Sequence, residues 1–149
     1  MDILNNILKV LPEGEITSAG FEGANIVLYT ANKNFFLESE SLIRDIVNNI
    51  KKRVELRADQ SILEAKDRTE EFIRKITPTE AGIEQVLFDE QRSLVTIEAK
   101  KPGLSIGKEG KILKEIKEKT FWIPVVRRSP IIRSLIIEGI RDVLYKESS

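Results

Sequence analysis

The sequence contains no cysteine and no histidine. Without cysteine there is no disulfide framework, no thiolate nucleophile and no zinc site built on thiolates. Without histidine there is no Ser-His-Asp triad, no histidine-ligated zinc and no imidazole general base. Together, the two absences predict that this chain is not itself an enzyme and holds no metal or other cofactor.

A net charge is also lacking, because 24 basic side chains balance 24 acidic ones. This balance excludes a uniformly basic coat for nucleic acid but leaves room for a local basic face. Residues 93–149 carry twelve basic and seven acidic side chains, whereas acidic ones are in excess before residue 93. The basic excess therefore gathers in the part of the chain that contains the glycine-rich loop described below.

Long hydrophobic runs are absent as well. The most apolar stretch, residues 131–143, is interrupted by Arg133, Glu138 and Arg141, so it cannot span a membrane. Residues 1–11 are amphipathic and do not form a signal-peptide core. We therefore expect a cytoplasmic protein with no membrane partner, and 41% hydrophobic residues are enough for a packed core.

The chain contains an internal repeat with a period that drifts from 66 to 70 residues. Pro12 aligns with Pro78, residues 26–27 align with residues 94–95, and Ile46 aligns with Ile116. Each copy predicts a helix, two strands, a short extra turn, a second helix and a final strand. In the first copy these are residues 2–10, 15–21, 26–31, 41–52 and 54–57, and in the second they are 64–76, 83–88, 94–99, 111–119 and 123–128.

The repeat predicts an α+β protein of two tandem domains, each a three-stranded sheet with helices packed on one face. Residues 131–149 show helical spacing of apolar side chains after Ser129 and Pro130. This C-terminal helix either packs on the domains or connects them to a further domain.

One motif carries chemistry, and it lies between a predicted strand and a predicted helix. It reads Lys-Pro-Gly-Leu-Ser-Ile-Gly-Lys-Glu-Gly-Lys over residues 101–111. Gly107 and Gly110 allow a close approach of the backbone to a ligand, and the amides that begin the next helix favour an anion. The spacing excludes a P-loop and a dinucleotide fingerprint. It is typical of the Gly-x-x-Gly loop of KH domains, which clamps the backbone of about four nucleotides.

The first copy has Ser39-Glu40-Ser41-Leu42 where the second has Gly107 to Gly110. It lacks the glycine pair and carries acidic residues, so we expect no phosphate binding there. The residues Phe35, Phe36 and Leu37 are interpreted as core side chains, with a binding role as the alternative. We read residues 1–60 as a degenerate KH-like domain, 61–130 as a type II KH domain, and 131–149 as the additional helix.

The whole pattern resembles the N-terminal region of the archaeal cleavage and polyadenylation specificity factor (CPSF) family. The resemblance rests on the degenerate first copy, on residues 77–83, on residues 101–110, and on Trp122 with residues 127–130. In that family the KH pair precedes a metallo-β-lactamase domain with a β-CASP insert. The resemblance implies a parent protein that is a zinc-dependent ribonuclease and terminates transcription. The zinc would belong to that nuclease domain, which this chain lacks, and the RNA would be uridine-rich.

We therefore predict a module that binds single-stranded RNA within a 3′-end processing or termination factor, with the transcription machinery as a further partner. Phosphates are expected on the loop and bases against Ile106, Leu113 and the last strand. The expected RNA-binding residues are Lys101, Ile106, Gly107, Lys108, Glu109, Gly110, Lys111, Leu113, Lys114, Arg127 and Arg128. The alternatives are a free-standing two-KH protein and a module that docks a protein partner or the nuclease.

Overall fold

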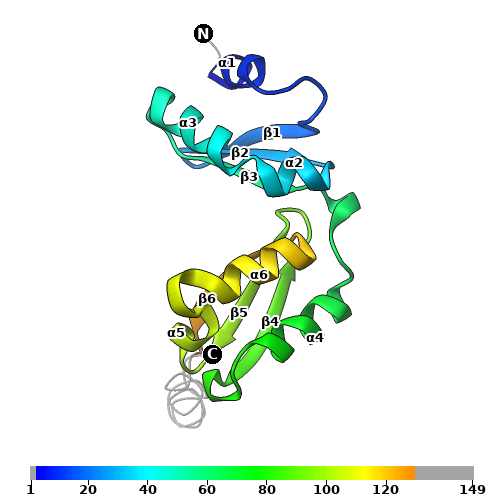
Figure 1. Ribbon diagram of the computed structural model, residues 1–149, viewed down its shortest axis with the longest axis vertical. Helices are drawn as coiled ribbons and strands as arrows, with labels where there is room; N and C mark the ends of the chain where they lie inside the picture. The colour runs from blue at the N-terminus through cyan, green and yellow to red at the C-terminus, as the bar shows by residue number, and fades with distance from the viewer. Residues whose placement is uncertain (1–2, 130–149) are drawn as a thin grey trace, which may run out of the picture.

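The computed structural model describes residues 3–129, which form two consecutive α+β units (Figure 1). The predicted α+β class is confirmed. The predicted helix at 131–149 lies outside the described residues.

The two units repeat one order of elements. The first contains α1 (Ile3–Val10), β1 (Ser18–Glu22), β2 (Asn25–Thr30), α2 (Lys33–Glu38), α3 (Glu40–Ile50) and β3 (Val54–Ala58). The second contains α4 (Lys66–Ile76), β4 (Ile83–Asp89), β5 (Leu94–Ala99), α5 (Pro102–Ile106), α6 (Lys111–Thr120) and β6 (Ile123–Arg128). Short 3-10 turns lie at Gln60–Ile62, Thr79–Ala81 and Lys108–Gly110.

Each unit has a three-stranded sheet of the same topology. The strand orders are β1-β2-β3 and β4-β5-β6. The first two strands of each sheet are antiparallel and the last two are parallel. Ile26 lies opposite Val54 in one sheet and Val95 lies opposite Pro124 in the other, and these positions are equivalent because Ile26 and Val95 both belong to the core of their unit.

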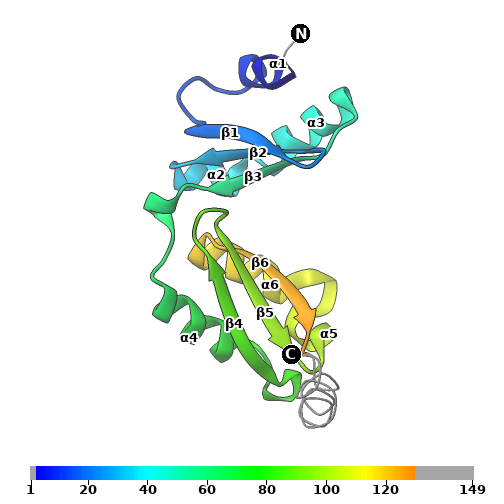
Figure 2. The same cartoon turned by 180° about the vertical axis from the view of Figure 1, so that it is seen from behind.

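Helices cover one face of each sheet. In the first unit, Ile7 of α1 and Ile46 of α3 pack with Leu28 and Leu56 of the strands. In the second, side chains of α4 and α6 pack with Val95, Ile97 and Trp122. Trp122 is 2% exposed, so it is a core residue. Seen from behind, the second sheet lies in front of α6, and no helix from residues 3–129 covers its other face (Figure 2).

The first strand and the extra turn differ from the prediction. The strand begins at Ser18 and not at residue 15, and Glu15 lies in the preceding loop, where its carboxylate accepts a hydrogen bond of 2.8 Å from the Asn32 side chain. The extra turn is a true helix in both units, α2 and α5. Asn32 caps α2 by accepting from the Phe35 amide, and Pro102 begins α5 with its fixed φ.

The units are joined through the tip of the β4–β5 hairpin, which reaches the first sheet (Figure 1). Ser93 at this tip is fully buried, and its hydroxyl donates to the Ala58 carbonyl. Gln60 donates to the Glu90 carbonyl, and Lys66 forms an ion pair with Glu90. The segment between the two sheets is therefore held to the hairpin.

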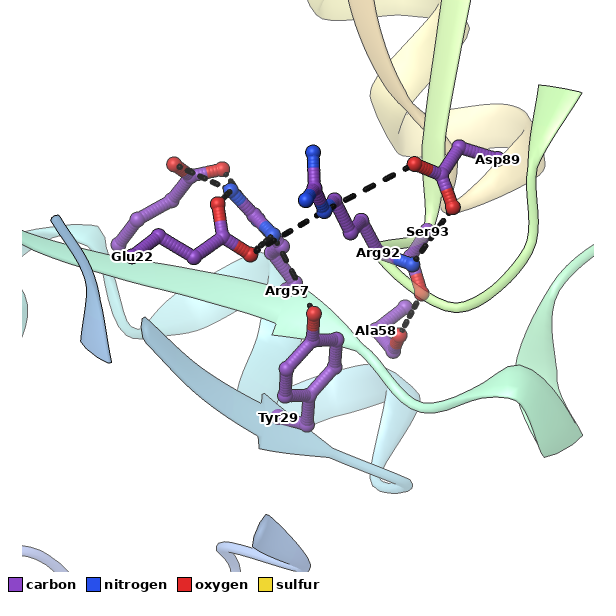
Figure 3. Close-up of polar contacts among 8 residues, drawn as sticks. Glu22, Tyr29, Arg57, Ala58, Asp89, Arg92 and Ser93 are labelled. Carbon is purple, nitrogen blue, oxygen red and sulfur yellow. Dashed lines mark hydrogen bonds and ion pairs between the residues drawn. The ribbon is translucent and has the colours of Figure 1, made fainter. Parts of the chain in front are cut away.

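A buried arginine network lies beside this tip (Figure 3). The Arg57 side chain is 5% exposed and donates to Glu22 at 2.6 and 2.9 Å, to Glu55 at 2.8 Å and to the Tyr29 hydroxyl at 3.2 Å. Burial acts to lower the pKa of Arg57, but the hydrogen bonds outweigh it and the pKa is raised. The hydrogen bonds from Arg57 lower the pKa of Glu22. Arg92 of the hairpin lowers it further, because its guanidinium lies 3.9 Å from the Glu22 carboxylate.

On the other side of the joint, α6 contacts α2. The Phe36 and Phe121 rings are 5.7 Å apart between centroids. Lys117 Nζ lies 5.2 Å from the Phe36 centroid, and Lys33 Nζ lies 5.3 Å from the Phe121 centroid. Such cation–π pairs stabilise a contact by about 0.5–2 kcal/mol each. The second unit thus holds the first through both the hairpin and α6.

None of the helices in residues 3–129 combines the length and the apolar character that a membrane crossing requires.

Candidate nucleic-acid interface

The glycine loop joins α5 to α6 in a sharp, left-handed path. Gly107 has φ 80° and ψ 172°, Glu109 has φ 57°, and Gly110 has φ 73°. Of these, the φ and ψ of Gly107 fall in a region that is essentially restricted to glycine, whereas the Gly110 conformation is left-handed helical. The motif therefore fixes the direction in which α6 begins.

The two glycines differ in what surrounds them. A Cβ on Gly107 would lie 2.8 Å from Ile112 Cγ1 and 3.1 Å from the Ile112 backbone nitrogen, whereas a Cβ on Gly110 would meet nothing within 4 Å. Gly107 is thus required by close packing as well as by backbone conformation. Gly110 faces open space at the start of α6.

The N-terminus of α6 is open and electropositive. No side chain caps it, so its first amides are free of side-chain acceptors. Lys108 and Lys111 are exposed beside these amides. The helix dipole and the amides that begin α6 favour an anion, and Lys108 and Lys111 place two positive charges in the same segment. The exposed carboxylate of Glu109 lies in the same loop and opposes that attraction.

The remaining predicted residues spread over three places. Ile106 is half-buried at the end of α5, and Lys101 is exposed at its start. Leu113 is half-buried and Lys114 exposed on α6, where both line a cleft toward the first unit. Arg127 and Arg128 end β6.

The two arginines lie on opposite faces of the second sheet. Arg127 pairs with Glu98, to which its Nε donates at 2.6 Å, on the face without helices. Arg128 lies opposite Ala99, which belongs to the helix-covered face. Sequence reasoning did not separate them, although the strand alternation contained that signal.

The first unit lacks the loop at the equivalent place. Ser39 joins α2 to α3 there with φ −92°, and it is 5% exposed. Glu40 begins α3 and forms an exposed ion pair with Arg44 at 2.9 Å. Phe36 is buried and Phe35 packs on the core, as interpreted, but Leu37 is 41% exposed. Leu37 lies on the wall of the cleft between the units.

That cleft has a volume of about 520 Å³ and was not predicted. Both units line it. The first unit contributes Phe36, Leu37, Ser39, Glu40, Ile43, Val54, Glu55 and Leu56, and the second contributes Leu113, Lys114, Lys117, Glu118, Ile123 and Pro124.

A Gly-x-x-Gly loop is the element with which KH domains clamp the nucleic-acid backbone. A family model described as the KH domain of the transcription termination factor FttA matches residues 1–63. This match confirms the resemblance to the archaeal, CPSF-like family. The KH description thus covers the first unit, even though that unit has no glycine loop.

The similarity extends along nearly the whole chain. This chain is 42% identical over 148 residues to the transcription termination factor FttA of Methanothermobacter thermautotrophicus. The alignment covers 99% of this chain and 23% of that protein. The chain is 39% identical to the FttA of Thermococcus kodakarensis with the same coverage, and 36% identical over 137 residues to that of Lokiarchaeum, covering 91% and 22%. The chain therefore spans about a quarter of the length of these relatives.

Proposed function

We propose that the chain is a single-stranded RNA-binding module, in which the loop of residues 107–110 grips the RNA backbone. The observation that carries the proposal is the uncapped N-terminus of α6 behind two positive-φ glycines, flanked by Lys108 and Lys111. Phosphates of an extended strand suit this arrangement, because backbone amides and ammonium groups both favour negative charge.

The two units correspond in this proposal to tandem type II KH domains. Residues 1–60 form the degenerate copy and residues 61–130 form the copy with the loop. The repeated order of elements and the shared sheet topology support this division. Ile106 and Leu113 would contact bases, while Lys101, Lys114 and Arg128 would add positive charge near the strand. Arg127 would contribute only after leaving Glu98.

The named relatives are transcription termination factors, and we propose the same role for the protein to which this chain belongs. Uridine-rich transcripts and the transcription machinery would then be its partners. Zinc-dependent cleavage would belong to the three quarters of the relatives that this chain does not cover. Among residues 3–129, no group of three or more acidic side chains is arranged to hold a metal ion.

The test is a titration of short single-stranded RNAs with fluorescence anisotropy at several salt concentrations. Four phosphate contacts give a log–log salt slope of roughly −3, at about −0.7 per contact. Replacing Lys108 and Lys111 by Ala should weaken binding to all sequences similarly and make the slope shallower by about 1.4, the share of two contacts. Replacing the exposed Lys9 and Lys75 by Ala is the matched control and should change neither quantity.

A slope near zero in the unmodified chain would refute the phosphate clamp. Unchanged RNA binding by the Lys108 and Lys111 variant would do the same, and would favour protein docking as the function.

A further inference from the structure

The cleft between the units is formed by equivalent parts of the two copies. Ile43 of α3 and Leu113 of α6 both line it and hold the same position of the repeat. Val54 of β3 and Pro124 of β6 are likewise equivalent, because they lie opposite the core residues Ile26 and Val95, and both line it. The groove beside the second helix of each copy thus opens toward the other copy.

The cleft begins within one helical turn of the glycine loop. Lys111 is the first residue of α6, and Leu113 and Lys114 already line the cleft. Three residues of α-helix rise about 4.5 Å. A nucleotide whose phosphate sits on the loop is therefore adjacent to the cleft.

The chemistry of the cleft suits a base better than a phosphate. Apolar side chains from both units form much of its wall, and Lys114, Lys117 and Glu118 are among the polar residues that line it. The other two acidic lining residues, Glu40 and Glu55, are paired with Arg44 and Arg57. Lysines donate to base carbonyls and a carboxylate accepts from base amino groups, so the lining can meet a base edge as well as an apolar base face. A volume of about 520 Å³ is within the range of small-molecule sites.

The first-unit wall of the cleft is held in place. Phe36 is 4% exposed and packs between Lys117 and Phe121 of the second unit. The neighbouring Leu37 is 41% exposed on the same wall. A wall fixed before binding loses little conformational freedom when a ligand enters, which favours binding.

We propose that this cleft is a base-binding subsite, and that the first unit, which has no glycine loop, supplies one of its walls. A base next to the clamped phosphate enters between Leu37 and Leu113. The proposal rests on the proposed RNA-binding function, and it assigns the degenerate copy a direct part in recognition.

The experiment measures RNA affinity of a Leu37→Asp variant of the full chain. The probes are a uridine heptanucleotide and versions in which one base at a time is replaced by an abasic nucleotide. We expect Leu37→Asp to weaken binding of the complete heptanucleotide about tenfold, the size of one lost base contact. For one abasic position the variant and the unmodified chain should bind equally, because the base that meets Leu37 is absent.

Val10→Asp is the matched control, since Val10 is 62% exposed on α1 and does not line the cleft. It should bind every probe as the unmodified chain does. Urea midpoints of both variants establish that they are folded, as expected for substitutions of exposed side chains.

The outcomes separate the two proposals. If Leu37→Asp binds the heptanucleotide normally while the Lys108 and Lys111 variant does not, the subsite is wrong and the backbone clamp stands. If Leu37→Asp loses affinity equally for every abasic probe, no base meets this wall and the subsite is again wrong. If the unmodified chain binds no RNA, both proposals fail.

Discussion

Substitution of the two loop glycines by Ala should affect stability very differently. Gly110 has a left-handed backbone conformation, which costs a non-glycine residue about 1–2 kcal/mol. Gly→Ala also restricts the unfolded chain, which stabilises the folded state by about 0.4–1 kcal/mol. A Cβ there meets nothing within 4 Å. Gly110→Ala should therefore lower the free energy of unfolding by only about 0.5–1 kcal/mol.

Gly107→Ala carries two further costs. Its φ of 80° and ψ of 172° lie in a region that disfavours alanine by about 1–3 kcal/mol. The new Cβ would also lie 2.8 Å from Ile112 Cγ1, and overpacking of this kind costs about 1–3 kcal/mol. The reduced freedom of the unfolded chain offsets a small part of these costs, as it does for Gly110→Ala. We therefore expect Gly107→Ala to lower the free energy of unfolding by about 3 kcal/mol. For a chain of this size the melting temperature should fall by roughly 6–12 °C.

Urea denaturation monitored by circular dichroism measures both losses, and two other glycines provide controls. Gly14 has φ 82° with open space around it, so Gly14→Ala should behave like Gly110→Ala. Gly103 lies in α5 without positive φ or a close neighbour, so Gly103→Ala should be neutral or stabilising. Equal losses at positions 107 and 110 would refute the assignment of Gly107 to packing against Ile112.

Two further predictions concern charges. Glu109→Gln should raise RNA affinity about threefold at low salt, because it removes a negative charge roughly 5 Å from a phosphate. The gain in affinity should fade at 0.5 M salt. Glu84→Gln, on the exposed edge of β4, is the control in the same anisotropy assay. The pKa of Glu22 lies below its ordinary value of 4.5, so its stabilisation is complete above about pH 4.5 and is lost as the pH falls through the folded-state pKa. Urea midpoints between pH 3 and 7 should decline less steeply below pH 4.5 for Glu22→Gln, and an unchanged decline would contradict the role of the Arg57 pair.

Much of each unit was predictable from sequence because its signals are local. Pro12 and Pro78 follow the first helix of each copy, and runs of β-branched residues predict the central strands. The Gly-x-x-Gly spacing predicted a loop between a strand and a helix, although the helix α5 inside that segment was expected only as a turn. Aligning residues 26–27 with 94–95 matched the two central strands but was wrong by one residue, because Ile26 shares the core-facing position of Val95.

The joint between the units could not be predicted in the same way. Ser93 contacts Ala58, 35 residues earlier, and the cleft brings Leu37 together with Leu113. Neither contact has a periodic signal, since each depends on the angle at which two finished units meet. Arg127 shows the same limit, because a cluster of basic residues in sequence says nothing about a carboxylate on the neighbouring strand.

The hairpin contact also has a consequence for the order of events during synthesis. The first unit can form its sheet once residue 58 is available, but the Ala58 carbonyl receives its partner only when Ser93 follows, 35 residues later. At roughly 5–20 residues per second this interval lasts about 2–7 s. The contact between the Phe36 and Phe121 rings forms later still, because Phe121 is synthesised after Ser93. The nascent first unit therefore passes through a period of lower stability, with part of its arginine network uncovered, until the second unit emerges and completes it.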